Sequence, residues 1–317
     1  MKKVLVIGGA GFIGSHLVDA LVDRNLRVSV LDKLDQQVHG TNREPPAYMN
    51  PRAQLIIGDV RDRELLMSAM DGAQVVFHLA AAVGVGQSMY EIERYVSANS
   101  QGTAVLLDVL ANQPHNVQKL IVASSMSIYG EGSYRCLKCG SIEATIRSEA
   151  QLQDSLWEPL CSHCHDMLEP IPTPETKSLQ PTSIYAITKK DQDEMALCVG
   201  KAYGIPTVAL RFFNVYGPRQ ALSNPYTGAA AIFSSRAMNN RPPLVFEDGL
   251  QMRDFVHVSD IVQANLIAMD NESANYQVFN VGTGRALSIL EIASIICEKL
   301  GPPGLKPEVT YRYRKGD

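Results

Sequence analysis

A glycine-rich turn between the first apolar run and the first amphipathic segment constrains this chain most strongly. The run "KVLVIG" at 3–8 leads directly into "GAGFIG", which spaces Gly8, Gly11 and Gly14 three apart. Glycines in this pattern allow a tight turn, a close approach of the backbone to a pyrophosphate and close packing of helix on strand. The helix N-terminus then offers free N–H groups to the phosphates. The stretch predicts a strand–turn–helix unit that binds a dinucleotide.

An acidic residue follows at the distance that such a site needs. Asp32 ends a second apolar run at 27–32, 18 positions after Gly14. A carboxylate there accepts hydrogen bonds from the adenosine ribose hydroxyls and repels a 2′-phosphate, which favours NAD over NADP. The adjacent Lys33 leaves NADP open, and a glycine-rich turn without a ligand is the alternative interpretation.

The rest of the chain predicts an α/β architecture. Apolar runs alternate with amphipathic segments over the first 215 residues, as in a parallel sheet covered by helices. We expect strands at 3–8, 27–32, 54–59, 74–80, 119–124 and 206–213, and helices at 12–24, 62–70, 95–112 and 183–203. The fold class is therefore a Rossmann doubly wound parallel sheet with a smaller C-terminal substrate-binding lobe and a small inserted zinc-ribbon-like module.

The expected domain boundaries lie where the alternation of apolar runs and amphipathic segments is interrupted. The NAD-binding domain takes 1–134 and continues at 178–214 and about 250–284, the inserted module takes 135–177, and the substrate-binding lobe takes 215–249 and 285–317. The chain ends at "YRKGD" without a predicted helix, so we expect a further C-terminal segment to be missing.

Ligands of doubly wound sheets bind beyond the carboxyl ends of the strands. The residues at these ends are therefore the predicted cofactor contacts: Gly8, Gly11, Phe12, Ile13, Gly14, Asp32, Asp59, Val60, Leu79, Ala80 and Ala81. His78 precedes the last group, and we interpret it as a structural histidine.

The stretch "YAITK" carries the predicted chemistry. Tyr185 and Lys189 stand four apart and thus on one face of the predicted helix. An ammonium near a phenol stabilises the phenolate and lowers the pKa of the phenol, which makes it a general base for a sugar hydroxyl.

With these motifs in place, the chain resembles the NDP-sugar epimerases and dehydratases of the extended short-chain dehydrogenases/reductases. The motifs "GGAGFIG", "GDVRD", "HLAA", "SSMSIYG", "YAITK", "RFFNVYGP" and "RDFVHVSD" occur in the family's order. The resemblance implies an NAD-dependent enzyme that acts on a nucleotide-diphosphate sugar, and a homodimer formed through helices near 95–112 and 183–203. It implies these roles: Ser125, Tyr185 and Lys189 are catalytic; Asn99, Tyr185 and Lys189 support the cofactor site; Ser125, Asn214 and Arg253 contact the substrate.

Two departures from the family pattern refine this expectation. The acid and base of the family's 4,6-dehydratases are replaced by Met126 and Ser127, which cannot transfer the protons that dehydration needs. We therefore expect C4 epimerisation through a 4-keto intermediate, with decarboxylation or 4-keto reduction as alternatives within the enzyme class. A dinucleotide-sensing regulator without catalysis is the alternative from another class.

The second departure is an insertion with four cysteines. Ser125 and Tyr185 are 60 positions apart, where the family has roughly half that number. The excess contains Cys136, Cys139, Cys161 and Cys164, two C-x2-C pairs with 21 residues between them. This spacing predicts a closed structural Zn²⁺ site that leaves no open position for catalysis. Surface thiols and iron are the alternatives, and His163 and His165 are substitute ligands.

We expect the inserted module to shape or cover the sugar pocket without taking part in hydride transfer, because its two ends lie at the serine strand and the tyrosine helix. With this insert, the chain is similar to the dTDP-L-rhamnose 4-epimerase subset of the family, so a dTDP-6-deoxyhexose or a UDP-hexose is the expected substrate. Cys198 and Cys297, on predicted helices, are expected to be buried.

The composition argues against two kinds of partner, nucleic acids and membranes. The 29 Lys and Arg residues are balanced by 33 Asp and Glu residues, so no basic excess predicts nucleic-acid binding. No apolar run approaches 18 residues, so we expect no membrane contact and a cytoplasmic location.

Overall fold

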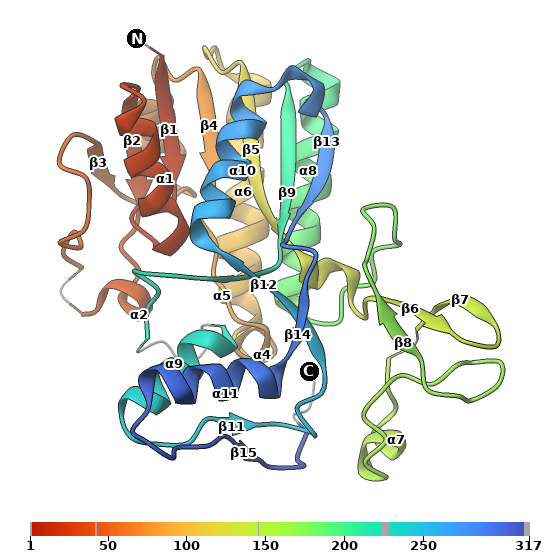
Figure 1. Cartoon of the computed structure of the whole chain (residues 1–317). Helices are drawn as coiled ribbons and strands as arrows, with labels where there is room; N and C mark the ends of the chain where they lie inside the picture. Colours follow the sequence, from red (N-terminus) through yellow and green to blue (C-terminus); the bar gives the residue numbers. More distant parts are fainter. Residues whose placement is uncertain (1, 42, 145, 223–227, 314–317) are drawn as a thin grey trace.

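A seven-stranded parallel sheet forms the centre of the molecule, and helices cover both of its faces (Figure 1). The structure is a computed structural model that describes residues 2–41, 43–144, 146–222 and 228–313. The strand order is β13-β9-β5-β4-β1-β2-β3, and all neighbours run parallel. The strands are β1 (Lys3–Ile7), β2 (Arg27–Asp32), β3 (Gln54–Ile57), β4 (Val75–His78), β5 (Lys119–Ser125), β9 (Thr207–Phe212) and β13 (Gln277–Val281).

The two faces of the sheet carry separate apolar cores because successive side chains of a strand point in opposite directions. On β1, Val4 and Val6 pack in the core that includes α1 and α10, whereas Leu5 and Ile7 pack in the core that includes α3, α6 and α8. The order of the strands reverses between β1 and β4. A crevice for ligands opens at such a switch point, beyond the carboxyl ends of the strands.

The helices expected at 12–24, 62–70 and 183–203 are present, within one residue of those bounds, as α1 (Phe12–Asp23), α3 (Arg63–Met70) and α8 (Ile184–Tyr203). The other long helices near the sheet are α6 (Gly102–Asn112) and α10 (Val258–Asp270). The side chain of Ser183 accepts a hydrogen bond from the backbone N–H of Ala186 at the start of α8, and Gly204 ends α8 in the left-handed conformation at φ 68°. Among the described residues, no helix is long and apolar enough to span a membrane.

The predicted helix at 95–112 is divided in the structure. It consists of α5 (Ile92–Tyr95), the π-helical turn η1 (Val96–Gln101) and α6. A π turn widens the helix and often occurs at functional sites, and here it carries Asn99. Two further short helices, α2 (Gln36–His39) and α4 (Val85–Ser88), lie in the loops after β2 and β4.

A smaller lobe lies beyond the carboxyl ends of the strands (Figure 1). It contains α9 (Ala229–Met238), β11 (Leu244–Val245), α11 (Ile289–Leu300) and β15 (Glu308–Val309), around a core that includes Phe233, Val245 and Ala293. A three-stranded sheet, β10-β12-β14, links the lobe to the main sheet. Its strands are β10 (Asn214–Tyr216), β12 (Met252–His257) and β14 (Ala286–Ser288), and the 3-10 turns η2 (Met126–Tyr129) and η3 (Glu272–Ala274) complete the core domain.

The cysteine-bearing insertion folds as a unit that projects from one side of the molecule (Figure 1). It contains β6 (Ser133–Cys136), β7 (Gly140–Glu143), α7 (Glu149–Gln153) and β8 (Glu169–Ile171), with an antiparallel sheet in the order β7-β6-β8. A small folded module is what the sequence predicts for this segment. Its core is small and includes Cys136, Cys161 and Leu168, so apolar periodicity is not what organises it.

Candidate active site

The glycine turn after β1 has two positions that only glycine fits. Gly8 has φ +85°, and a Cβ there would lie 2.6 Å from the backbone nitrogen of Ala80, at the end of β4. A Cβ on Gly14 would lie 2.2 Å from the carbonyl oxygen of Gly8. The first glycine thus permits the turn beside β4, and the third permits α1 to pack against it.

Gly11 is different, because no neighbour in the described part of the chain requires glycine there. Its φ is −72°, and an added Cβ would meet only the carbonyl oxygen of Gly8, at 3.5 Å. Gly11 is also the N-cap of α1, with no side chain bonded to the free N–H groups of that helix end. A ligand that approaches the backbone closely explains this glycine, so the turn fits a dinucleotide pyrophosphate. Phe12 and Ile13 form the first turn of α1 behind it.

Asp32 lies next to this turn at the end of β2. Its carboxylate accepts hydrogen bonds from the backbone N–H groups of Ala10 (3.0 Å) and Leu34 (2.9 Å). Lys33 forms a salt bridge with Asp35 at 3.0 Å. The charge of Lys33 is therefore already paired, which fits the predicted preference for NAD.

The remaining predicted cofactor residues lie at the same edge of the sheet. Asp59 and Val60 follow β3, and Leu79, Ala80 and Ala81 follow β4. Asp59 accepts hydrogen bonds from the guanidinium of Arg61 at 2.6 and 2.9 Å. A cavity of about 660 Å³ opens between the ends of β2 and β3 and is lined in part by Lys33, Ile57 and Asp59.

The predicted catalytic residues come together although they are distant in the sequence. Ser125 is the last residue of β5, and Tyr185 lies in the first turn of α8. The Ser125 hydroxyl lies close enough to the phenol of Tyr185 to act on it as a hydrogen-bond partner. The backbone N–H of Tyr185 donates to the hydroxyl of Ser88 at 3.0 Å, and the ring of Tyr185 meets Tyr95 edge to face, with centroids 6.4 Å apart.

The charge state of this pair differs from the sequence-based expectation. Burial raises the pKa of Tyr185, and the hydrogen bond with Ser125 opposes that shift. Lys189 is 4% exposed, and burial lowers its pKa to about 7. Its ammonium donates to the carbonyl oxygen of Ala123 at 2.8 Å. The expected lowering of the Tyr185 pKa by Lys189 is therefore not found: burial raises this pKa, and Ser125, not Lys189, is the group that opposes the shift.

Asn99 ties the cofactor edge to the tyrosine helix. Its side-chain oxygen accepts from the backbone N–H of Ala82 at 2.7 Å, and its amide nitrogen donates to Thr188 on α8 at 2.9 Å. His78 is buried beneath this link. Its Nε2 lies 2.9 Å from the hydroxyl of Thr103, and burial lowers the pKa of His78 to about 3. A neutral, buried imidazole matches the structural role predicted for His78.

The predicted substrate contacts lie on the small sheet. The side chain of Asn214 donates to the carbonyl oxygen of Asp254 at 3.1 Å and contacts the sulfur of Met126 at 3.7 Å. Arg253 is exposed on β12, and among the described residues it forms no salt bridge with Asp254. Asp254 instead accepts from the backbone N–H groups of Thr283 and Gly284. The guanidinium of Arg253 is thus available for a phosphate.

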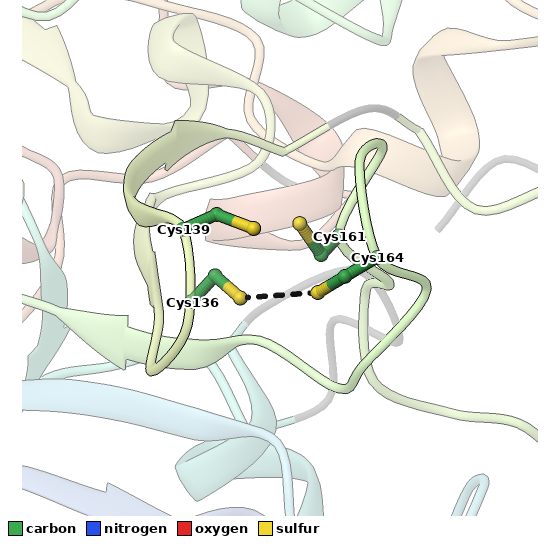
Figure 2. Close-up of side chains that lie close together, drawn as sticks. All are labelled: Cys136, Cys139, Cys161 and Cys164. Carbon is green, nitrogen blue, oxygen red and sulfur yellow. Dashed lines mark hydrogen bonds between the residues drawn. The ribbon is translucent and has the colours of Figure 1, made fainter.

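The four paired cysteines face one another in the insertion (Figure 2). All four Sγ atoms lie within 4.8 Å of one another, and those of Cys136 and Cys164 are 3.5 Å apart. The backbone N–H of Cys164, followed by that of His163, lowers the pKa of Cys161 to about 6, whereas the neighbouring thiols raise the pKa of Cys139 to about 12. The proximity of the four sulfur atoms is therefore the observation that favours a metal site here. His163 is exposed and lies outside this cluster of ligand atoms.

One cysteine prediction is wrong. Cys297 is buried as expected, but Cys198 is exposed on α8. Because α8 packs against the sheet along only one face, an apolar residue on such a helix is not necessarily inside.

Ser88 and Tyr95 were not singled out from the sequence, and Ser127 was considered there only as a residue that replaces a dehydratase group. The hydroxyl of Ser127 donates to that of Ser125 at 2.9 Å. Ser127 stands within a recognised motif, so its spacing signalled its proximity. Ser88 and Tyr95 carry no such signal, because only the folding of α4 and α5 against α8 brings them to Tyr185.

Comparisons with known proteins agree with this geometry. The model of the NAD dependent epimerase/dehydratase family matches residues 4–150 and 160–282. A dTDP-L-rhamnose 4-epimerase from Burkholderia thailandensis is 34% identical over 323 residues, which cover 100% of this chain and 85% of that protein.

Solved structures of nucleotide-sugar epimerases are also similar to this chain. A UDP-glucose 4-epimerase from Thermotoga maritima, in a structure with UDP-glucose, is 31% identical with a TM-score of 0.79 over 99% of this chain and 87% of that one. A UDP-glucose 4-epimerase from Thermus thermophilus, in complex with NAD, is 29% identical with a TM-score of 0.74 over 99% of this chain and 88% of that one.

Proposed function

Because the chain belongs to the NAD dependent epimerase/dehydratase family, we propose that it inverts C4 of a nucleotide-diphosphate sugar through a transient 4-keto intermediate. The observation that carries this function is the contact between Ser125 and Tyr185, with Lys189 one helical turn further along α8 and the glycine turn at the same edge of the sheet.

The roles of the chain's own residues follow from their positions. Tyr185 takes the proton of the C4 hydroxyl and later returns it, while Ser125 holds that hydroxyl in line with the phenol. Bound NAD supplies the hydride acceptor for the oxidation and the hydride donor for the reduction. Lys189, in its protonated form, supplies positive charge that favours the phenolate. Asn214 and Arg253 hold the diphosphate, so that the 4-keto sugar can rotate within the pocket and receive the hydride on its opposite face without dissociating.

The substrate we propose is a dTDP-6-deoxyhexose such as dTDP-L-rhamnose, or a UDP-hexose. The 34% identity to a dTDP-L-rhamnose 4-epimerase supports the first, and the likeness to UDP-glucose 4-epimerases supports the second. Met126 and Ser127 stand where a 4,6-dehydratase needs ionisable groups. Met126 contacts Asn214, and the hydroxyl of Ser127 is bonded to Ser125, so neither is placed to remove water across C5 and C6.

A conversion screen tests the function. The purified protein, with NAD in catalytic amount, is incubated with dTDP-L-rhamnose, UDP-glucose and UDP-glucuronic acid, and the products are resolved by NMR. We expect the C4 epimer of one of the first two. Release of CO₂ from the acid would indicate a decarboxylase, and stoichiometric use of NAD(P)H a 4-ketoreductase. Tight NAD binding without any conversion would favour a dinucleotide sensor.

We propose further that the four cysteines hold one structural zinc ion. Tetrahedral Zn–S bonds of about 2.3 Å place the sulfur atoms about 3.8 Å apart, which the cluster approaches without rearrangement of its loops. Metal analysis of the purified protein should find one zinc per chain. The metal should be lost from Cys139→Ser/Cys164→Ser and kept in the control Cys198→Ser. Iron, or no metal, would overturn the assignment.

The domain division and the dimer are part of the same proposal. The separate core of the lobe and the separate core of the insertion support boundaries near 134, 178 and 215. A homodimer through η1, α6 and α8 is supported by apolar side chains exposed there, of which Val96 and Ile187 are 43% and 42% exposed.

A further inference from the structure

A buried ion pair joins the inserted module to the substrate lobe. The guanidinium of Arg147 lies 2.8 Å from the carboxylate of Glu247, 100 positions away, and the two side chains are only 13% and 7% exposed. The same guanidinium nitrogen donates to the carbonyl oxygen of Trp157 at 2.8 Å. Surface ion pairs contribute little to stability, but loss of one partner of a buried pair leaves a costly unpaired charge.

The lobe is built to receive this arginine. The backbone N–H of Glu247 donates to the carbonyl oxygen of Arg312 at 2.8 Å, and its carbonyl accepts from Tyr311 at 3.1 Å. This fixes the turn in which Glu247 adopts φ +56°. Across the described parts of the chain, Arg147 is the one cation within salt-bridge distance of the Glu247 carboxylate. The lobe therefore presents a buried carboxylate whose counter-charge comes from the insertion.

Arg147 lies on the loop at 140–160, between the two cysteine pairs. The cysteine cluster closes the base of this loop, and a salt bridge of 2.8 Å between Lys138 and Asp166 joins the two knuckles beside it. Closing the ends of a loop reduces the conformational entropy that is lost when its tip docks. The cluster thus prepares Arg147 for its contact with the lobe.

The docked turn leads directly into the proposed substrate site. Arg253, the proposed diphosphate contact, follows Glu247 by six positions, at the start of β12. Arg253 is also close to the insertion. Burial raises the pKa of Tyr134 on β6, and the charge of Arg253 is near enough to that phenol to oppose the shift. The insertion therefore approaches the segment 247–253 at two points: Arg147 contacts Glu247, and Tyr134 lies near Arg253.

We propose that the loop at 140–160 is a brace that docks on the substrate lobe through Arg147 and Glu247, and that this contact sets how tightly the nucleotide sugar is bound. Arg147 is a positioning residue, because it acts on the substrate through the turn that precedes Arg253. The inference rests on the proposed function for its substrate but not for the docking itself.

The test compares Arg147→Met with Arg135→Met in the NAD-bound full chain. Arg135 forms an exposed ion pair with Glu169 inside the insertion, so its loss controls for any change of surface charge there. We expect Arg147→Met to speed hydrogen exchange at 140–160 and 244–249 and to weaken binding of dTDP or UDP, measured by calorimetry, by about tenfold. KM should rise by a similar factor, with kcat changed by less than about twofold. Arg135→Met should match the parent protein.

A second pair of variants keeps the test decisive if Arg147→Met destabilises the lobe. Glu247→Gln removes the charge but keeps the shape, and Arg147→Met/Glu247→Gln should bind no worse than Arg147→Met alone, because the two changes break one contact. Unchanged exchange at 244–249 in Arg147→Met, or additive losses in the double variant, would overturn the brace. If the parent protein binds neither nucleotide, the proposed function fails, while the exchange measurement still decides the docking.

Discussion

At the scale of the residue, burial decides the charge state of the proposed proton-transfer pair. Tyr185 and Lys189 are on the same helix, yet burial favours the neutral form of both, because it raises the pKa of Tyr185 and lowers that of Lys189. Charge at either group is unfavourable in an environment of low polarity, and only a nearby counter-charge or a hydrogen bond offsets this. Ser125 provides such a bond to Tyr185.

Replacement of Tyr185 by Phe removes the proposed base and little else, since the ring keeps its contact with Tyr95. We expect kcat to fall by about 10²- to 10⁴-fold while NAD and the sugar nucleotide still bind. Steady-state kinetics and calorimetry measure the two effects. Tyr203→Phe, at the exposed end of the same helix, is the matched control. Activity near that of the parent in Tyr185→Phe would remove Tyr185 from this role.

Lys189 predicts a specific dependence of stability on pH. Its pKa falls from 10.5 to about 7 on folding because it is buried. Between these values the unfolded chain binds more protons than the folded chain, so the contribution of Lys189 to the free energy of unfolding increases as pH rises from 7 to 10. The slope is at most about 1.4 kcal/mol per pH unit.

Urea unfolding of the NAD-free protein at pH 7, 8.5 and 10 measures this contribution. The stability of the parent relative to Lys189→Met should rise over the range, whereas its stability relative to Lys201→Met, an exposed lysine of the same helix, should stay constant. A parent–Lys189→Met difference that does not change with pH would contradict the burial argument.

At the scale of the element, the turn between β1 and α1 contains one glycine that the packing of the chain requires and another that only a bound ligand would require. Gly14 is required by the contact of α1 with the turn, because its Cβ would lie 2.2 Å from the carbonyl oxygen of Gly8. Gly11 has room and an ordinary φ of −72°. Gly14 is therefore needed for the packing of α1 on the turn, whereas the approach of a ligand explains Gly11.

Alanine substitutions at these two glycines should therefore affect different properties, stability at Gly14 and NAD binding at Gly11. Gly14→Ala forces a backbone shift and should lower the free energy of unfolding by about 1–3 kcal/mol. Gly11→Ala should leave stability within about 0.5 kcal/mol and weaken NAD binding, because its methyl group occupies the path of the pyrophosphate. Chemical unfolding and NAD titration check both. Gly86→Ala, where nothing lies within 4 Å, is the control. Equal NAD affinity for Gly11→Ala and the parent would place the pyrophosphate elsewhere.

At the scale of the whole molecule, three bodies meet at the carboxyl edge of the sheet: the core domain, the lobe and the insertion. Each has its own apolar core. The β10-β12-β14 sheet links the lobe to the core domain, and the pair of Arg147 and Glu247 links the insertion to the lobe. The face of η1 and α8 away from this edge carries exposed apolar side chains, which the proposed homodimer would cover.

Ile187→Glu should therefore break the dimer. A carboxylate at an apolar interface loses its hydration without gaining a partner, so the association should weaken by orders of magnitude. Analytical ultracentrifugation should show a dimer for the parent and a monomer for Ile187→Glu. Ile267→Glu, on α10 and 53% exposed, should remain dimeric. A monomeric parent protein would disprove the proposed homodimer.

The core of the fold could be predicted because its signals are local. The strands of the first 215 residues and the helices that follow them appear within a few residues of the expected bounds. Alternation along a strand and the 3.6-residue period of a helix are properties of neighbouring residues, and so is the strain that requires Gly8 in its turn. The spacing of four positions from Tyr185 to Lys189 likewise puts both on one face of one helix.

The amino-acid sequence alone is thus enough to predict the chemical groups and the elements that bear them. Which of these groups meet depends on the tertiary structure, which brings Ser125 to Tyr185, Asn99 to Thr188 and Arg147 to Glu247. Contacts between residues so far apart depend on how whole elements pack. The same packing fixed the neutral tendency of Lys189, because desolvation is a property of the folded surroundings and not of the residue.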